Sequence, residues 1–80
     1  MELLYKTDKA LLSMMRKKVK YYENRITKYR EEGNEDMVSW CSGMLEGYAE
    51  AVYQLFGKVT VQKVCDKQGR VCEVYIHLLA

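Results

Sequence analysis

The spacing of apolar residues changes at Gly57, and this change constrains the fold more than any other feature of the chain. Before Gly57, apolar side chains recur every three or four residues, which predicts α-helix. After it, two short runs are rich in β-branched residues, which predicts strands. The 80 residues contain no proline, so no proline interrupts the helices. We therefore expect one α+β domain over residues 1–80, in which an antiparallel helical hairpin precedes a C-terminal β-hairpin, the order ααββ.

The first helix is expected over about residues 8–32. Either Thr7 or Asp8 can accept a hydrogen bond from the free amides of the first turn. Gly33 can adopt the left-handed conformation that ends a helix. The residues predicted to face the core are spaced by three or four: Leu11, Met15, Val19, Tyr22, Ile26 and Tyr29.

The second helix is expected over about residues 35–56, with Asn34 as its N-cap and Gly57 after its end. So short a connection makes the two helices antiparallel neighbours. One polar stripe runs along the second helix: Glu35, Ser39, Ser42, Glu46, Glu50 and Gln54. Its other residues are almost all apolar or small, which gives an apolar face wider than one neighbouring helix can cover.

The β-hairpin is expected over about residues 58–79, with a turn at residues 66–70 in which Gly69 is left-handed. The register that follows pairs Asp66 with Arg70. It also pairs Val64 with Cys72, and Lys63 with Glu73, so that two of the three cross-strand pairs are opposite in charge. A looser six-residue loop, which would pair Cys65 with Cys72, is the alternative.

In the favoured register both sheet faces are partly apolar. One carries Cys72, Val74, Ile76 and Leu78, and the other carries Val59, Val61, Val71, Tyr75, His77 and Leu79. A lone two-stranded sheet is marginally stable and leaves two edges open. Together with the wide apolar face of the second helix, this favours a homo-oligomer that extends the sheet, most simply a two-fold dimer.

The residues predicted for the oligomer interface are Trp40, Gly43, Gly47, Tyr75 and His77. Each interior helix glycine costs roughly 1 kcal/mol relative to alanine. We expect close approach by another element to offset that cost at Gly43 and Gly47. That element belongs either to the same chain or to a partner.

Charge is strongly segregated, although the net charge is only +2. Residues 16–30 carry seven basic side chains and one acidic one, whereas residues 31–57 carry six acidic side chains and no basic one. The candidate binding residues are Arg16, Lys17, Lys20, Arg25 and Lys28. These cations could neutralise nucleic-acid phosphates while interleaved tyrosines stack on bases. A solvated face is the favoured interpretation, because two of the tyrosines lie on the core stripe and the neighbouring helix is acidic.

No spacing of residues indicates catalysis, and we expect neither an enzyme nor a cofactor. Three cysteines without a C-x-x-C pair are typical of reduced thiols, and His77, the single histidine, lacks the neighbours of a zinc site. Glu46 and Glu50 lie one helical turn apart but on the polar stripe. The sequence contains no apolar run long enough to predict a membrane span. The pattern of the first residues is not that of a secretion signal, so a cytoplasmic location is expected.

The helical hairpin resembles small uncharacterised proteins encoded by phages and prophages of Gram-positive bacteria. The residues that suggest this are 21–26 (YYENRI), 33–37 (GNEDM), 40–41 (WC) and 43–48 (GMLEGY), all within residues 21–56. The resemblance implies an accessory or anti-defence role in the host cytoplasm, such as anti-CRISPR-like occlusion of a host protein or sequestration of a nucleotide signal. It implies no functional residues. We thus expect a small non-enzymatic binding protein, with a nucleic-acid-binding protein as the alternative.

Overall fold

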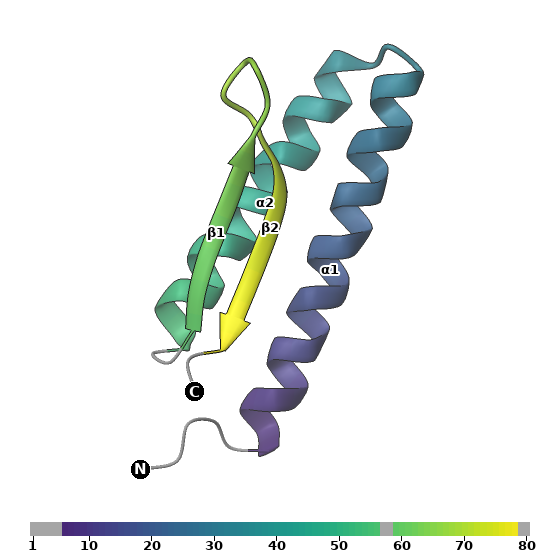
Figure 1. Cartoon of the computed structure of the whole chain (residues 1–80). Coiled ribbons are helices and arrows are strands. Elements are labelled where there is room, and N and C mark those ends of the chain that lie inside the picture. Colours follow the sequence, from purple (N-terminus) through teal and green to yellow (C-terminus); the bar gives the residue numbers. More distant parts are fainter. Residues whose placement is uncertain (1–5, 57–58, 79–80) are drawn as a thin grey trace.

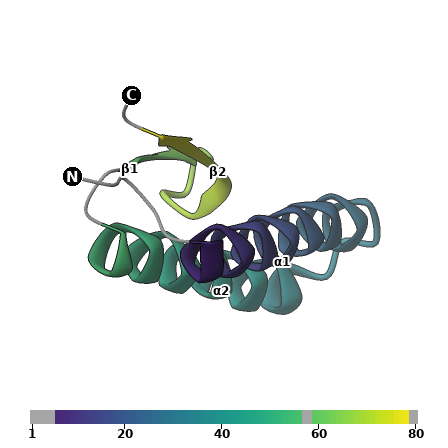
Figure 2. The same cartoon turned by 90° about the horizontal axis from the view of Figure 1, so that it is seen from below.

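The computed structural model describes residues 6–56 and 59–78. It contains helix α1 (Lys6–Glu31), helix α2 (Glu35–Leu55), strand β1 (Val59–Cys65) and strand β2 (Val71–Leu78). The two helices lie antiparallel in one layer, and the β-hairpin covers one face of that layer (Figures 1 and 2). The predicted ααββ order and α+β class are therefore confirmed.

The predicted boundary between the helices is confirmed in detail. Gly33 has a φ of 73°, so it ends α1 in the left-handed region that favours glycine. The Asn34 side chain accepts a hydrogen bond from the Met37 backbone N–H at 3.3 Å, which caps α2. At the other end, Phe56 has extended backbone, so α2 ends at Leu55, one residue earlier than predicted. Gly57 lies outside the described residues.

The turn of the β-hairpin is also as predicted. Gly69 has a φ of 80°, the Asp66 N–H donates to the Arg70 carbonyl at 2.9 Å, and the Gly69 N–H donates to the Asp66 carbonyl at 3.0 Å. These contacts exclude the looser six-residue loop, and Cys65 pairs with Val71 instead of with Cys72.

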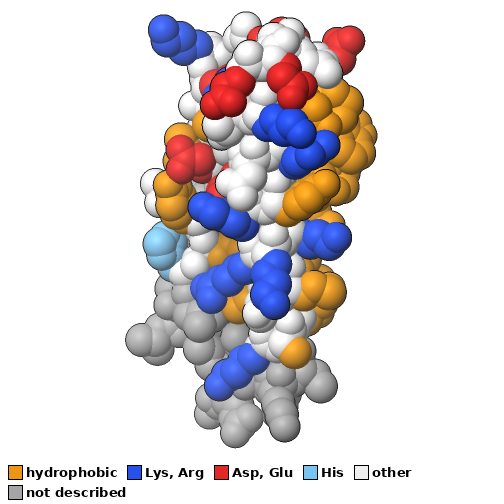
Figure 3. All heavy atoms as spheres, turned by 90° about the vertical axis from the view of Figure 1, so that its right-hand side faces the viewer, with side chains coloured by type: hydrophobic (Ala, Val, Ile, Leu, Met, Phe, Trp, Pro, Cys, Tyr) orange, Lys and Arg blue, Asp and Glu red, His pale blue; other side chains and the backbone are white. Residues whose placement is uncertain are grey.

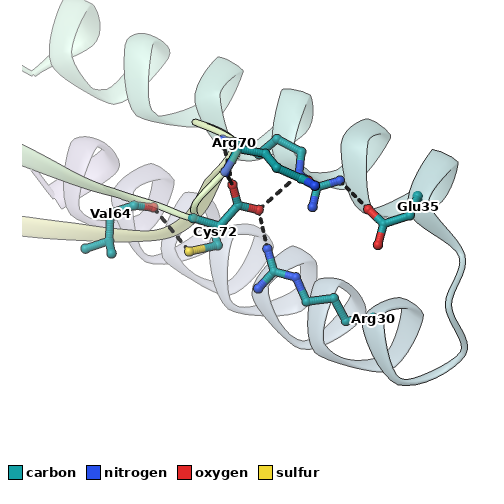
Figure 4. A network of polar contacts seen from close by, with 7 residues as sticks. Arg30, Glu35, Val64, Arg70 and Cys72 are labelled. Atoms are coloured by element: carbon teal, nitrogen blue, oxygen red, sulfur yellow. Dashed lines mark hydrogen bonds and ion pairs between the residues drawn. The ribbon is translucent and has the colours of Figure 1, made fainter.

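Beyond the turn, the predicted register is wrong by one residue. Val64 pairs with Glu73 and Lys63 pairs with Val74, because a β-bulge shifts the ladder between Val64 and Cys65. Cys72 is the extra residue of the bulge. Its thiol donates to the Val64 carbonyl at 3.3 Å, a contact drawn in Figure 4.

The bulge also corrects the predicted composition of the two sheet faces. It lets Val71 and Val74, three residues apart, both be buried against the helices. The inner face therefore combines residues that were predicted on opposite faces: Val59, Val61, Val71, Val74 and Ile76. Tyr75 and His77 are exposed and alternate with them, so they belong to the outer face with Thr60, Gln62 and Glu73.

The core fills the space between the helices and the inner sheet face. One cluster of buried residues lies towards the turn between the helices: Val19, Ile26, Val38, Cys41, Leu45, Ala49, Val71 and Val74. A second lies towards the other end: Leu12, Met15, Val52, Phe56 and Val59. Tyr48, Val61 and Ile76 pack against both. The wide apolar face of α2 is thus covered in part by α1 on one side and by the β-hairpin on the other, whereas Trp40, Tyr53 and Leu55 stay exposed. Ser42, predicted on a solvated stripe, is buried.

The outer edge of β2 is occupied by side chains of α1. The Glu23 carboxylate accepts a hydrogen bond from the Val74 N–H at 2.9 Å, and Arg16 donates to the Ile76 carbonyl at 3.0 Å. One of the two sheet edges that were expected to be open is therefore capped within the chain.

Candidate functional site

One face of the helical layer has no described element packed on it. All the polar contacts between helices and hairpin lie on the other face: they involve Arg16, Glu23 and Arg30 of α1 and Glu35 and Glu50 of α2. From the helical period, the uncovered side carries Lys18 and Arg25 among apolar side chains that include Leu11, Met14, Tyr21, Tyr22, Trp40, Met44 and Tyr48. We call these residues, with Gly43 and Gly47, the helical face. Tyr21 is 52% and Trp40 is 54% exposed.

Aromatic rings form the centre of the helical face. The Tyr22 ring lies with its centroid 5.1 Å from Tyr21, 5.9 Å from Trp40 and 5.9 Å from Tyr48, so it joins the two helices. Tyr22 and Tyr48 are half-buried and support the exposed rings of Tyr21 and Trp40. The result is an exposed aromatic surface supported by packed rings, of the kind that supplies the anchor residues of protein interfaces.

Arg25 lies beside this cluster and is held by it. Its guanidinium carbon is 4.9 Å from the centroid of the Tyr29 ring and 5.8 Å from that of Tyr21. Its Nη2 donates to the Tyr29 hydroxyl at 2.5 Å, and this hydrogen bond raises the pKa of Arg25 further above its ordinary value. Contacts within the chain therefore hold the positive charge of Arg25 beside the aromatic rings of the helical face.

The surroundings of the two helix glycines bear on the expected close approach by another element. Gly43 and Gly47 are exposed, and a methyl group added at either would meet nothing within 4 Å. No described part of the same chain approaches them. A close approach by another element of the same chain is therefore not seen within residues 6–56 and 59–78.

The structure divides the predicted basic binding residues. Arg16 binds the edge of β2, and Arg25 stacks on tyrosines. Lys17, Lys20 and Lys28 are exposed and make no ion pair with any residue in 6–56 or 59–78. Lysine and arginine side chains lie along α1 in Figure 3, with hydrophobic side chains beside them at the right-hand edge. Three of the five predicted binding residues are therefore exposed without such contacts, and their binding role stays a prediction.

The predicted interface residues also fall into two groups. Trp40, Gly43 and Gly47 share the helical face, whereas Tyr75 and His77 lie on the outer face of the β-hairpin, on the opposite side of the molecule. One flat interface cannot contain all five. The prediction omitted Tyr21, Met44 and Tyr48, whose signal was the excess of apolar residues beside the core positions of both helices.

A cluster of ion pairs fixes the tip of the β-hairpin to the turn between the helices (Figure 4). Asp66 binds Arg30 at 2.5 Å and Arg70 at 3.0 Å, and Arg70 binds Glu35 at 2.7 Å. Burial by itself raises the pKa of Asp66, but hydrogen bonds from the Arg70 side chain and from the backbone of Arg70 and Gln68 outweigh it and lower the pKa. The charged side chains of the cluster pair with one another, and because they come from both helices and the hairpin, these pairs position the hairpin.

The groups considered for chemistry are dispersed. Cys41 is buried, Cys65 is exposed and Cys72 is half-buried, and Glu50 pairs with Lys63 at 3.5 Å. No three His, Cys, Asp or Glu side chains within the described ranges are placed to hold a metal ion. Neither described helix is long and apolar enough to cross a membrane.

Family models, curated proteins and solved structures were all compared with the chain, and none of them matches it.

Proposed function

We propose that this chain is a small non-enzymatic binding protein that acts through its helical face. The observation that carries the proposal is the pair of exposed aromatic side chains, Tyr21 and Trp40, held on a framework of half-buried rings. Exposed aromatic residues supported in this way are characteristic of protein interfaces, where they bury large areas at a small entropic cost.

The chemistry of the surroundings indicates the class of partner. Lys17 and Lys28 flank the helical face from α1 and Lys18 lies on it, so a partner that is apolar at its centre and acidic opposite α1 fits best. Four pockets lined by described residues hold between 210 and 290 Å³, at or below the lower end of the range of about 300–1,000 Å³ for small-molecule sites. The proposal therefore rests on the exposed aromatic side chains of the helical face and not on these pockets.

The resemblance of residues 21–56 to phage and prophage proteins adds a biological setting. The role that follows is an accessory or anti-defence inhibitor that occludes a host protein in the cytoplasm. The helical face supplies the contact surface for such occlusion, because it is extended, aromatic and not covered by another described element.

The test is site-specific photo-crosslinking in cells that express the chain. A photoreactive phenylalanine analogue replaces Tyr21 on the helical face or, as the control, Tyr75 on the outer face of the hairpin, which is 45% exposed. We expect a defined protein adduct from position 21 and none from position 75. With the partner purified, Trp40→Ala should raise its Kd by at least about tenfold. Equal adducts from both positions, or binding insensitive to Trp40→Ala, would overturn the proposal.

A second candidate function rests on the exposed lysines of α1. Lys17, Lys20 and Lys28 are exposed on a helix that also carries exposed aromatic rings. Proteins that bind single-stranded nucleic acids combine basic and aromatic side chains in this way. Binding of a labelled single strand should weaken steeply with salt and be lost in the Lys17→Glu, Lys20→Glu variant. Fluorescence anisotropy that shows salt-independent binding, or none, would exclude this candidate.

A further inference from the structure

We propose that the partner on the helical face is a second copy of this chain, packed so that α1 of each copy lies on α2 of the other. The inference rests on the proposed function, because it concerns the same surface: a second copy and a host protein would compete for the helical face. The assembly would be an antiparallel four-helix bundle with one β-hairpin on each of its two outer sides (Figure 2 shows one half).

The arrangement of the helical face limits how two copies can meet. Two-fold symmetry allows the axis to run parallel to the helices or across them. A parallel axis places α1 over the partner's α2, whereas a perpendicular axis places α1 over the partner's α1. Only the parallel axis leaves the position of each residue along the bundle unchanged in the second copy. Tyr21 would then lie near the partner's Trp40, in the same way as Tyr22 lies near Trp40 within one chain.

The charges of the two helices select between these arrangements. Helix α1 carries nine basic and three acidic side chains, a net charge of +6, whereas α2 carries four acidic and no basic side chains, a net charge of −4. Pairing α1 with the partner's α1 brings like charges together along both seams. Pairing α1 with the partner's α2 brings opposite charges together along both seams. The surface is therefore complementary to its own copy.

One rim pair matches in height as well as in sign. Counted from the turn between the helices, Lys28 and Asp36 both lie within the first turns at 1.5 Å per residue. Both are exposed, and neither contacts the hairpin through an ion pair with a described residue. In the bundle, Lys28 faces the partner's Asp36.

The size and shape of the helical face suit such a dimer. Two helices side by side, each about 30 Å long and 10 Å wide, present about 600 Å² in projection. The accessible area of a corrugated side-chain surface is larger, and stable interfaces bury about 800 Å² per partner. Gly43 and Gly47 leave open space on the α2 side of the face, where a helix from the second copy can approach closely.

The first experiment is sedimentation velocity of the purified chain from low to high micromolar concentration. We expect a monomer–dimer equilibrium in which Trp40→Ala raises the dimer Kd by at least about tenfold. Tyr75→Ala, the matched control on the outer hairpin face, should leave it unchanged. Circular dichroism of each variant checks that it is folded. A folded monomer at every concentration, or a dimer unaffected by Trp40→Ala, would overturn the inference.

The second experiment tests which helices meet. Reversing Lys28 to Glu should raise the dimer Kd about threefold or more, because two rim pairs become repulsive. Mixing this variant with a chain that carries Asp36→Lys should restore association as a heterodimer. An unchanged Kd after the lysine reversal would exclude the pairing of α1 with the partner's α2. A chain that stays monomeric here but gives the photo-adduct from position 21 with another protein refutes this inference and leaves the proposed function standing.

Discussion

At the residue scale, the three cysteines show how environment separates chemically identical groups. Cys41 lies in the main core cluster and is 1% exposed, and its burial raises the pKa of its thiol, an effect that the charge of Arg25 only partly offsets. Cys65 is exposed at the end of β1. Cys72 is half-buried in the bulge and donates to a backbone carbonyl. Because only the thiolate is nucleophilic and a reagent must reach it, the three cysteines should differ in their rates of alkylation.

We therefore predict that iodoacetamide alkylates Cys65 fastest and Cys41 slowest in the folded chain. Peptide-level mass spectrometry over a time course measures the three rates separately. In denaturant the three rates should converge, which serves as the control. Equal rates for Cys41 and Cys65 under native conditions would contradict the burial of Cys41.

At the scale of the elements, the cap on the outer edge of β2 holds the hairpin beside α1. The Glu23 carboxylate accepts a hydrogen bond from the Val74 N–H at 2.9 Å, and the bond is strong because the acceptor is charged. Without it, a half-buried strand edge would lose the partner of a backbone donor. The contact between Arg16 and the Ile76 carbonyl is exposed and should contribute less.

Glu23→Ala should lower the free energy of unfolding by about 1–2 kcal/mol, whereas Arg16→Ala should cost less than about 1 kcal/mol. Urea denaturation followed by circular dichroism measures both. Hydrogen exchange at the Val74 amide should accelerate in Glu23→Ala and recover in Glu23→Gln, which retains an acceptor. Unaltered exchange at Val74 would show that the edge is not held by Glu23.

At the scale of the whole molecule, the charge cluster around Asp66 ties together the hairpin tip, the end of α1 and the start of α2. Because the folded-state pKa of Asp66 is lowered, its contribution to stability is present above the unfolded pKa of about 4. That contribution is lost as the pH falls through the lower folded-state value. Acid should therefore loosen the contact between the hairpin and the helical turn.

The Asp66→Asn variant should unfold at lower urea concentration than the wild type near neutral pH. The difference should shrink as the pH is lowered from about 7 to about 2, since the wild-type carboxylate becomes protonated too. Glu46→Gln, at an exposed position with no described ion pair, is the matched control and should show little difference. A gap between wild type and Asp66→Asn that does not narrow in acid would contradict the role given to the cluster.

The sequence by itself determined the elements whose signals are local. Gly33 ends α1, Asn34 caps α2 and Gly69 closes the turn, because each acts within a few residues of its own position. Trp40, Gly43 and Gly47 were likewise predicted to lie on an interface from their positions on one helix, and the structure places them together on the uncovered side. That they form an interface stays a prediction.

Only the tertiary structure decided how these elements combine. The bulge at Cys72 arises because Val71 and Val74 both gain from burial against the helices, a long-range benefit that strand alternation does not reveal. The same packing places Tyr75 on the outer face of the hairpin. It also places Arg16 against the edge of β2, where it is separated from the other predicted binding residues. Local spacing cannot show which side of α2 a distant hairpin covers. Burial of apolar surface settled that choice, and with it which helical face is left uncovered.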